Sequence, residues 1–317
     1  MPNEFYIVPE AALDATADAI REKTGSQASI EFTQDGFADA IEDIPSESTD
    51  PLWGNGTYEY KNDNITAAHN NPFAAWPVNG NLKISLPNCL SWEKAFNMIN
   101  PGQTVLTRLN LPKLQSCPNS FIRRQGGLTA IYLPAVTSIT QESLKELWGI
   151  NKDLVLPSLT NAQSVQQFIS LGTSNGGITV NIYMPALTTF SFNNSFQDCK
   201  FTKIIDFGSA AGNIGNAVFK NCYILDTIIF RKSDGIVNLT TDGATAFENS
   251  PFNGYNNLTG TVYCPSALID TYKSATNWST LYNNGTVSFS AIEGSQYENL
   301  DYVALAAPAK AVQEDWL

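Results

Sequence analysis

The stretch LTAIYLPAVTSI, from Leu128 to Ile139, decides how this chain folds, because its pattern returns along most of the sequence. It combines a short alternating run, an apolar residue followed by proline, and a second apolar run. The apolar residue and proline recur at Leu86-Pro87, Leu111-Pro112, Leu133-Pro134, Leu156-Pro157, Met184-Pro185 and Cys264-Pro265. Phe207 and Phe230 continue the series without proline, and these anchors from 86 to 230 lie 22 to 28 residues apart. Such a period predicts a solenoid of stacked repeats.

Two further landmarks keep step with these anchors. A strand-like segment precedes most of them, at 82–85, 106–109, 128–132, 178–182, 201–205 and 225–229. A bulky apolar residue follows each anchor 10 to 12 residues later, or 17 in the last case: Phe96, Phe121, Leu144, Phe168, Phe196, Phe219 and Phe247. Each repeat, or rung, should therefore supply a strand, a turn and a return segment that buries the aromatic ring. The return at 163–170 is expected to be helical, and residues 231–257 are expected to form an insertion.

The repeated phrase resembles the leucine-rich repeats of BspA-like bacterial surface antigens, with close variants at 106–114 and 178–190. The resemblance covers residues 81–293 and is looser after residue 207. It implies an α+β repeat solenoid, a leucine-rich-repeat type stack of parallel β-strands. Residues 264–273, read as strand, turn and helix, and the strand expected at 286–292 resemble the closing cap of such proteins in Firmicutes and their phages.

The N-terminal 47 residues have a different, helical pattern. Leu13 and Ile20 fall on one face of an expected helix, and Phe37 and Ile41 lie in a second helix that ends at Pro45. The runs at 17–25 and 37–41 resemble a small helical module found at the N-terminal ends of Firmicutes phage tail and baseplate-type proteins. The resemblance implies that these four apolar residues attach the chain to other virion proteins. A plain helical hairpin that caps the first rung is an alternative reading, and the two readings are compatible.

Four segments follow from these patterns: a helical attachment module at 1–47, a linker and cap at 48–80, the solenoid with its C-terminal cap at 81–293, and a tail at 294–317. The tail is read either as a frayed end or as a docking segment for a neighbouring subunit, since it is rich in apolar residues. Aromatic residues among asparagines suit carbohydrate or protein contacts, although they also suit packing of the cap. The candidate binding surface therefore comprises Trp53, Tyr58, Tyr60, Trp76, Phe252 and Tyr255.

Composition and motifs bear on the remaining classes of function. The net charge of −12 disfavours nucleic-acid binding, and the lack of a long apolar run disfavours membrane insertion. His69 is the single histidine and no catalytic motif is present, so we expect no enzyme, no cofactor and no metal site. Asp206, Asp226, Asp234 and Asp242 are isolated carboxylates, each better explained by surface solvation. Cys199 and Cys222, 23 residues apart, should stack on adjacent rungs near disulfide range, and free buried thiols are expected in preference to a disulfide.

These observations predict a non-catalytic phage tail-fibre or baseplate protein, assembled in the host cytoplasm and located in the virion. Its solenoid would bind a host cell-surface polysaccharide or protein, or other virion proteins. The absence of a basic segment in the first 20 residues favours this over an exported bacterial cell-surface adhesin. A polysaccharide depolymerase is the other alternative, and would need two carboxylates about 5 to 9 Å apart. A homo-oligomer is left open.

Overall fold

The computed structural model describes residues 57–61, 63–65, 67–68, 80–92, 96–97, 104–166, 169–171 and 178–317. These all belong to one compact unit that begins at Asn55. The expected N-terminal module lies outside the described residues, and so do Trp53, Trp76 and Phe168. Tyr58 and Tyr60 lie in β1 (Thr57–Lys61), where only their backbone is described.

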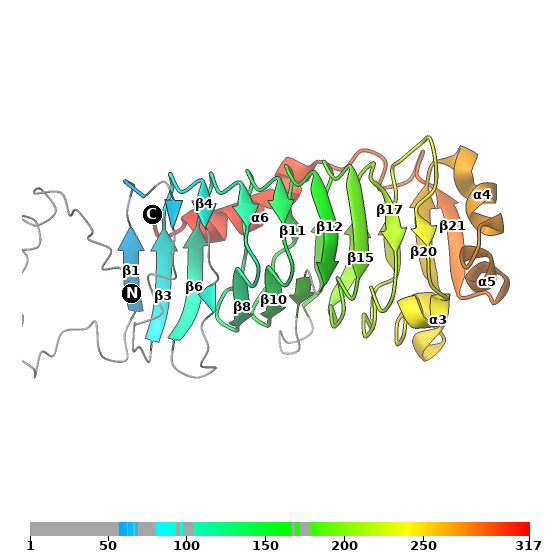
Figure 1. The fold of residues 1–317 in the computed structure, drawn as a ribbon, viewed down its shortest axis with the longest axis horizontal. Coiled ribbons are helices and arrows are strands. Elements are labelled where there is room, and N and C mark those ends of the chain that lie inside the picture. The colour runs from blue at the N-terminus through cyan, green and yellow to red at the C-terminus, as the bar shows by residue number, and fades with distance from the viewer. Residues whose placement is uncertain are drawn as a thin grey trace, which may run out of the picture. The chain divides into compact units, whose positions relative to one another are not determined.

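The described chain winds into a stack of rungs, and every strand pairing within it is parallel (Figure 1). The first face carries β1 (Thr57–Lys61), β3 (Gly80–Ser85) and β6 (Thr104–Asn110) in one sheet. The same face continues as a six-stranded sheet of β11 (Leu154–Val155), β14 (Val180–Tyr183), β16 (Thr202–Asp206), β18 (Thr227–Ile229), β20 (Gly260–Cys264) and β21 (Val287–Ala291). These strands contain or overlap five of the six strand segments expected from the sequence.

Two more faces complete each rung. The second face holds β7 (Ser116–Cys117), β9 (Ser138–Ile139), β12 (Asn161–Gln166), β15 (Thr189–Asn193), β17 (Ala211–Ile214) and β19 (Asn238–Leu239), with the pair β2 (Ala67–Ala68) and β4 (Ser91–Trp92) before them. The third face holds β5 (Phe96–Asn97), β8 (Ile122–Gln125), β10 (Leu144–Leu147) and β13 (Ile169–Leu171). The repeat solenoid of parallel strands is confirmed.

Three details of the rungs differ from the expectation. The described parts of the return expected to be helical, 163–166 and 169–170, are extended, because β12 pairs with β15 on the next rung and thereby satisfies its backbone hydrogen bonds. Residues 128–132 form no regular strand, so the first face has a gap between β6 and β11. The insertion at 231–257 also serves as a rung, since it contributes β19, the short helix α3 (Gly243–Ala246) and two 3-10 turns.

Two columns of stacked aromatic rings fill the C-terminal half of the core. Phe196, Phe219, Phe247 and Phe252 follow one another with ring centroids 5.7, 5.0 and 4.9 Å apart. Phe207, Phe230, Tyr272 and Phe289 form the second column, at 5.5, 6.0 and 5.4 Å. The prediction of Phe252 as a surface residue is wrong, because its fully buried ring extends the first column into the insertion.

Cysteine stacking and the closing cap are as expected. The thiols of Cys199 and Cys222 lie side by side on adjacent rungs, and each donates to a backbone carbonyl, of Ile169 at 3.2 Å and of Phe196 at 3.1 Å. None of the five cysteines forms a disulfide bond. The cap consists of a 3-10 turn (Ser266–Leu268), α4 (Ile269–Ser274), α5 (Trp278–Asn283) and β21. These helices cover the end of the stack (Figure 1).

Glycine replaces proline in the anchor after Phe207 for a steric reason. Gly208 has a φ of +57°, and a Cβ at this position would lie 2.5 Å from the carbonyl oxygen of Pro185 on the preceding rung. Only glycine tolerates both the left-handed backbone and this close approach. Its N–H donates to Asp206 at 2.9 Å, which tightens the turn next to a buried carboxylate.

Candidate functional site

The C-terminal tail folds back onto the solenoid that precedes it. After β21 the chain turns, and residues 295–317, here called the strap, run along the first face to β6 (Figure 1). The strap contains α6 (Tyr302–Glu314), whose first turn is capped by Asp301, which accepts hydrogen bonds from the N–H groups of Val303 and Ala304 at 3.0 Å. The reading of this tail as a frayed end is therefore wrong.

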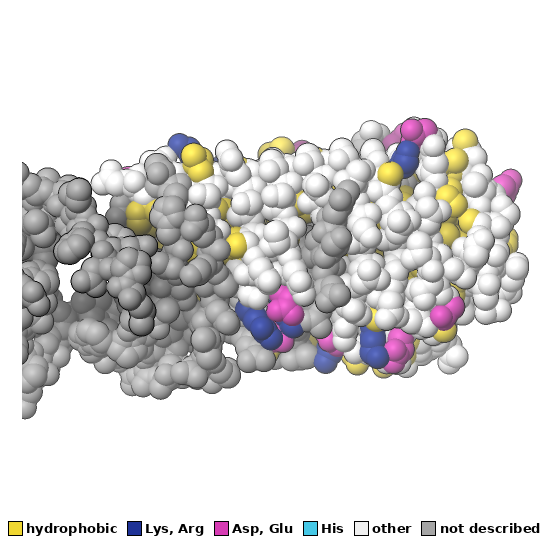
Figure 2. All heavy atoms as spheres, in the orientation of Figure 1, with side chains coloured by type: hydrophobic (Ala, Val, Ile, Leu, Met, Phe, Trp, Pro, Cys, Tyr) yellow, Lys and Arg dark blue, Asp and Glu magenta, His cyan; other side chains and the backbone are white. Residues whose placement is uncertain are grey.

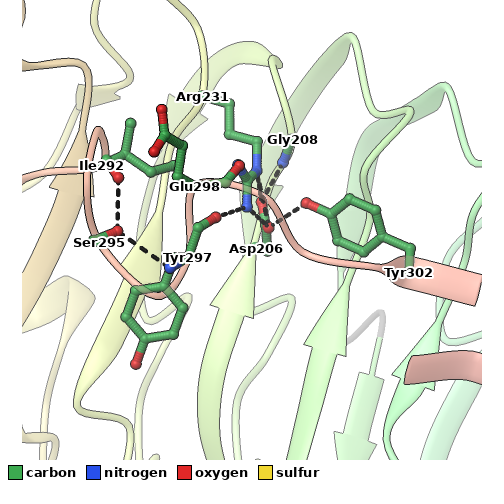
Figure 3. Close-up of polar contacts among 8 residues, drawn as sticks. All are labelled: Asp206, Gly208, Arg231, Ile292, Ser295, Tyr297, Glu298 and Tyr302. Carbon is green, nitrogen blue, oxygen red and sulfur yellow. Dashed lines mark hydrogen bonds and ion pairs between the residues drawn. The ribbon is translucent and has the colours of Figure 1, made fainter. Parts of the chain in front are cut away.

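A buried ionic cluster, here called the clasp, holds the start of the strap (Figure 3). Asp206, at the end of β16, is fully buried and accepts hydrogen bonds from Arg231 at 2.9 Å and from the Tyr302 hydroxyl at 2.7 Å. Arg231 also donates to the backbone carbonyls of Tyr297 at 2.6 Å and Glu298 at 3.0 Å. One guanidinium thus joins the sheet carboxylate to the strap backbone.

The protonation states of the clasp follow from this geometry. Burial disfavours the charged guanidinium, but the hydrogen bond and the charge of Asp206 outweigh burial and raise the pKa of Arg231. Burial, and then the charge of Asp206, raise the pKa of Tyr302. Arg231 is therefore charged and Tyr302 is a neutral hydrogen-bond donor throughout the physiological pH range.

The far end of the strap is fixed by one buried amide, one surface ion pair and a cation–π contact. Gln313 reaches between rungs, accepting from the Leu109 N–H at 2.8 Å and donating to the Ala130 carbonyl. Arg108 forms a two-pronged ion pair with Asp315, with both distances at 3.1 Å. The Trp316 ring lies 4.7 Å from the ammonium of Lys61. Between the two ends, α6 packs Ala306 against Val155 and Tyr183.

Among the described residues, the second face carries small uncharged side chains. In its register, Ser116, Ser138, Asn161, Thr189 and Ala211 are successive partners, and Ser191, Asn213 and Asn238 form a second row. Beside them Thr137, Thr160 and Thr188 each donate a hydroxyl hydrogen bond to a carbonyl of the preceding rung. Over β12, β15 and β17 the surface is mostly free of charge, and charged side chains gather along the lower edge (Figure 2).

A polar and aromatic ledge lies at one corner of the C-terminal rungs. Asn221 donates to Asp198 at 2.7 Å and Asn249 donates to Asn221 at 2.9 Å, which makes a row across three rungs. All three have a left-handed backbone, with φ of 65°, 60° and 57°. A parallel row places the Tyr223 ring 5.2 Å from the Tyr255 ring and 5.9 Å from the ammonium of Lys200. We call these six residues the ledge.

No family model, curated protein or solved structure matches this chain.

The structure brings together a different set of residues from the one predicted. Tyr255 is half-buried and belongs to the ledge, whereas Phe252 lies in the core. Trp53, Trp76, Leu13, Ile20, Phe37 and Ile41, and the side chains of Tyr58 and Tyr60, are outside the described residues. Tyr223, Asn221 and Lys200 were not predicted. The interval of 23 residues between Asp198 and Asn221 equals the repeat period and could have indicated their row.

The four carboxylates considered from the sequence all have structural partners. Asp206 belongs to the clasp, and Asp226 accepts from Thr227 at 2.8 Å and lies 3.5 Å from Lys203. Asp234 pairs with Lys232, and Asp242 caps α3 through Thr245. Asp206 is therefore buried rather than solvated, which corrects the expectation for that residue.

Within the described ranges, no group of three His, Cys, Asp or Glu side chains could hold a metal ion. Over the same ranges, no helix has the length and apolar content that crossing a membrane requires. His69 is not among the described residues.

Proposed function

We propose that this chain is a non-catalytic bacteriophage virion protein of the tail fibre or baseplate, built on BspA-like leucine-rich repeats. Residues 1–47 attach it to other virion proteins, and the solenoid binds a polysaccharide or protein on the host cell surface. The N-terminal and repeat resemblances support the phage assignment. The observation that supports the mode of binding is that the strap packs on the first face, whereas the described outward side chains of the second face are small and uncharged.

The chemistry of the second face, and of the amides and tyrosines of the ledge, suits a neutral polysaccharide. Asparagine amides, threonine hydroxyls and tyrosine rings supply the hydrogen bonds and apolar contacts that such a ligand uses. Asn249 and Asn256 are exposed beside half-buried Tyr255, so a ligand can reach both amide and aromatic groups there. The residues of the second face repeat from rung to rung, about 4.8 Å apart, so a long polysaccharide can make several equivalent contacts with them.

Binding of the full-length protein to whole Gram-positive host cells and to their isolated wall polysaccharide tests the proposal. The variants Tyr255→Ala and Asn249→Ala should weaken binding about tenfold, whereas Tyr282→Ala, an exposed tyrosine on α5, should not. Equal binding by all of these variants would place recognition elsewhere. If the protein binds no cells yet enters virus particles, its repeats serve assembly instead.

Attachment has its own test. A chain without residues 1–47 should keep the circular dichroism of a folded solenoid and no longer enter particles. Incorporation of the truncated chain would contradict the role proposed for Leu13, Ile20, Phe37 and Ile41. A source genome that encodes the chain far from any phage genes would favour the adhesin alternative.

A further inference from the structure

Solenoids have a characteristic weakness, because each rung contacts only its neighbours and the stack can open from either end. The strap supplies contacts of another kind. Tyr302 and Asp206 are 96 positions apart in the sequence, Gln313 and Leu109 are 204 apart, and Lys61 and Trp316 are 255 apart. We propose that the strap is a brace that couples the N-terminal rungs to the C-terminal rungs, so that the described solenoid opens as a single unit.

The brace acts at the gap in the first face. Strand β6 is the edge of its sheet, and residues 128–132 on the next rung form no regular strand. Two buried glutamine amides accept from N–H groups of β6 that face the gap, and only Gln313 also donates to residues 128–132, since Gln125 donates to Arg123 in its own strand. Gln125 accepts from the Leu106 N–H at 3.0 Å, and Gln313 accepts from the Leu109 N–H and donates to the Ala130 carbonyl. A glutamine amide carries the same donor and acceptor as a peptide group, so it can bridge two strands.

Of these two glutamines, only Gln125 belongs to the N-terminal rungs themselves. Gln125 lies in β8, which follows β6 on the same rung, so its hydrogen bond to Leu106 forms when that rung folds. Gln313 arrives from the last turn of α6, after every rung has been passed. Without it, the Leu109 N–H and the Ala130 carbonyl would be buried without these partners, which is costly. Complete hydrogen bonding at the gap therefore depends on the C-terminus of the chain.

The other end of the brace cannot slide. Tyr302, at the start of α6, donates to Asp206, and Arg231 holds two carbonyls of the strap directly before it. Gln313 lies in the same 13-residue helix, so a shift of the helix that keeps one set of bonds breaks the other. Buried polar groups tolerate no such mismatch. The clasp at β16 thus sets the position of Gln313 at β6.

Hydrogen exchange of the full-length protein tests this coupling. Tyr302→Phe removes one hydroxyl from the clasp and leaves the Asp206–Arg231 pair in place. If the strap is a brace, amides of residues 104–110 and 128–132 should exchange about fivefold to tenfold faster, which corresponds to the loss of one hydrogen bond. Lys310→Ala, on the exposed side of the same helix, should leave these rates unchanged.

Two results would overturn the proposal. In the first, Tyr302→Phe accelerates exchange only near its own contacts, in 204–208 and 295–305. In the second, Gln313→Leu, which keeps the side-chain bulk but cannot bridge, leaves exchange at Leu106 and Leu109 unchanged. If Gln313→Leu does not fold, the Tyr302→Phe comparison still decides. The outcome is independent of ligand binding, so it does not depend on the proposed function.

Discussion

Replacement of Asp206 by asparagine should destabilise the protein severely without changing the shape of the side chain. The carboxylate is fully buried and accepts from Arg231, from the Tyr302 hydroxyl at 2.7 Å and from the Gly208 N–H at 2.9 Å. The asparagine amide would keep one oxygen acceptor and would turn an NH₂ group toward donors. Removing one partner of a buried ion pair costs about 3–5 kcal/mol. We expect about 3 kcal/mol, since the Arg231 side chain is 18% exposed and retains two backbone carbonyls.

Urea unfolding followed by tryptophan fluorescence measures this loss. The matched control is Asp226→Asn, because Asp226 lies one rung further along, is 40% exposed and faces Lys203 at 3.5 Å. A surface pair of this kind contributes at most about 1 kcal/mol. The double variant Asp206→Asn, Arg231→Met should lose less than the sum of its two single variants, because it leaves no unpaired buried charge. A loss below about 1 kcal/mol for Asp206→Asn would refute the reasoning.

Three further predictions concern the core. Phe219→Ala should cost about 3–5 kcal/mol in urea unfolding, because both faces of its ring are covered, by Phe196 and Phe247. Burial raises the pKa of the Cys264 thiol to about 12, so iodoacetamide at pH 8 should label it only after unfolding, as read by mass spectrometry. Burial also raises the pKa of Tyr272, so the folded state keeps the phenol proton longer than the unfolded state does. The contribution of the Tyr272 phenol to the free energy of unfolding is therefore complete below the unfolded-state pKa of about 10. Above that pH it falls by about 1.4 kcal/mol per pH unit, which urea unfolding at pH values from 8 to 11 would measure.

The sequence predicted the repeat because its signal is periodic. Anchors such as Leu111 and Leu133 must be buried in every rung, and a buried position that recurs is visible in one dimension. The same logic placed Phe196 and Phe219 in the core and put Cys199 beside Cys222. Each of these residues interacts with its equivalent one period away.

Contacts that skip many rungs leave no such period. Gln313 meets Leu109 across 204 positions, and nothing near either residue in the sequence points to the other. For that reason the sequence alone does not distinguish a tail that docks on its own solenoid from a frayed end or an intermolecular segment, although the tail is rich in apolar residues. The prediction for Phe252 was wrong for another reason. Phe252 lies in an irregular segment whose sequence shows no period, although its ring continues the regular column of Phe196, Phe219 and Phe247. The ledge is partly predictable from the sequence. Asn221 follows Asp198 by one repeat period, but the spacing from Tyr223 to Tyr255 is not one period.

The strap also decides which surface a partner can use. The strap packs over residues that directly precede the anchors. They include Tyr183, which lies beneath the strap, and the buried Asp206. A partner that displaced the strap would uncover apolar side chains and would break the bonds of Tyr302 and Gln313, a loss that its own contacts must first offset. Binding at the second face or the ledge needs no such displacement, because the strap packs on the first face and Tyr255 of the ledge is already partly exposed. We therefore expect binding to occur on the second face and the ledge rather than on the face that the strap covers.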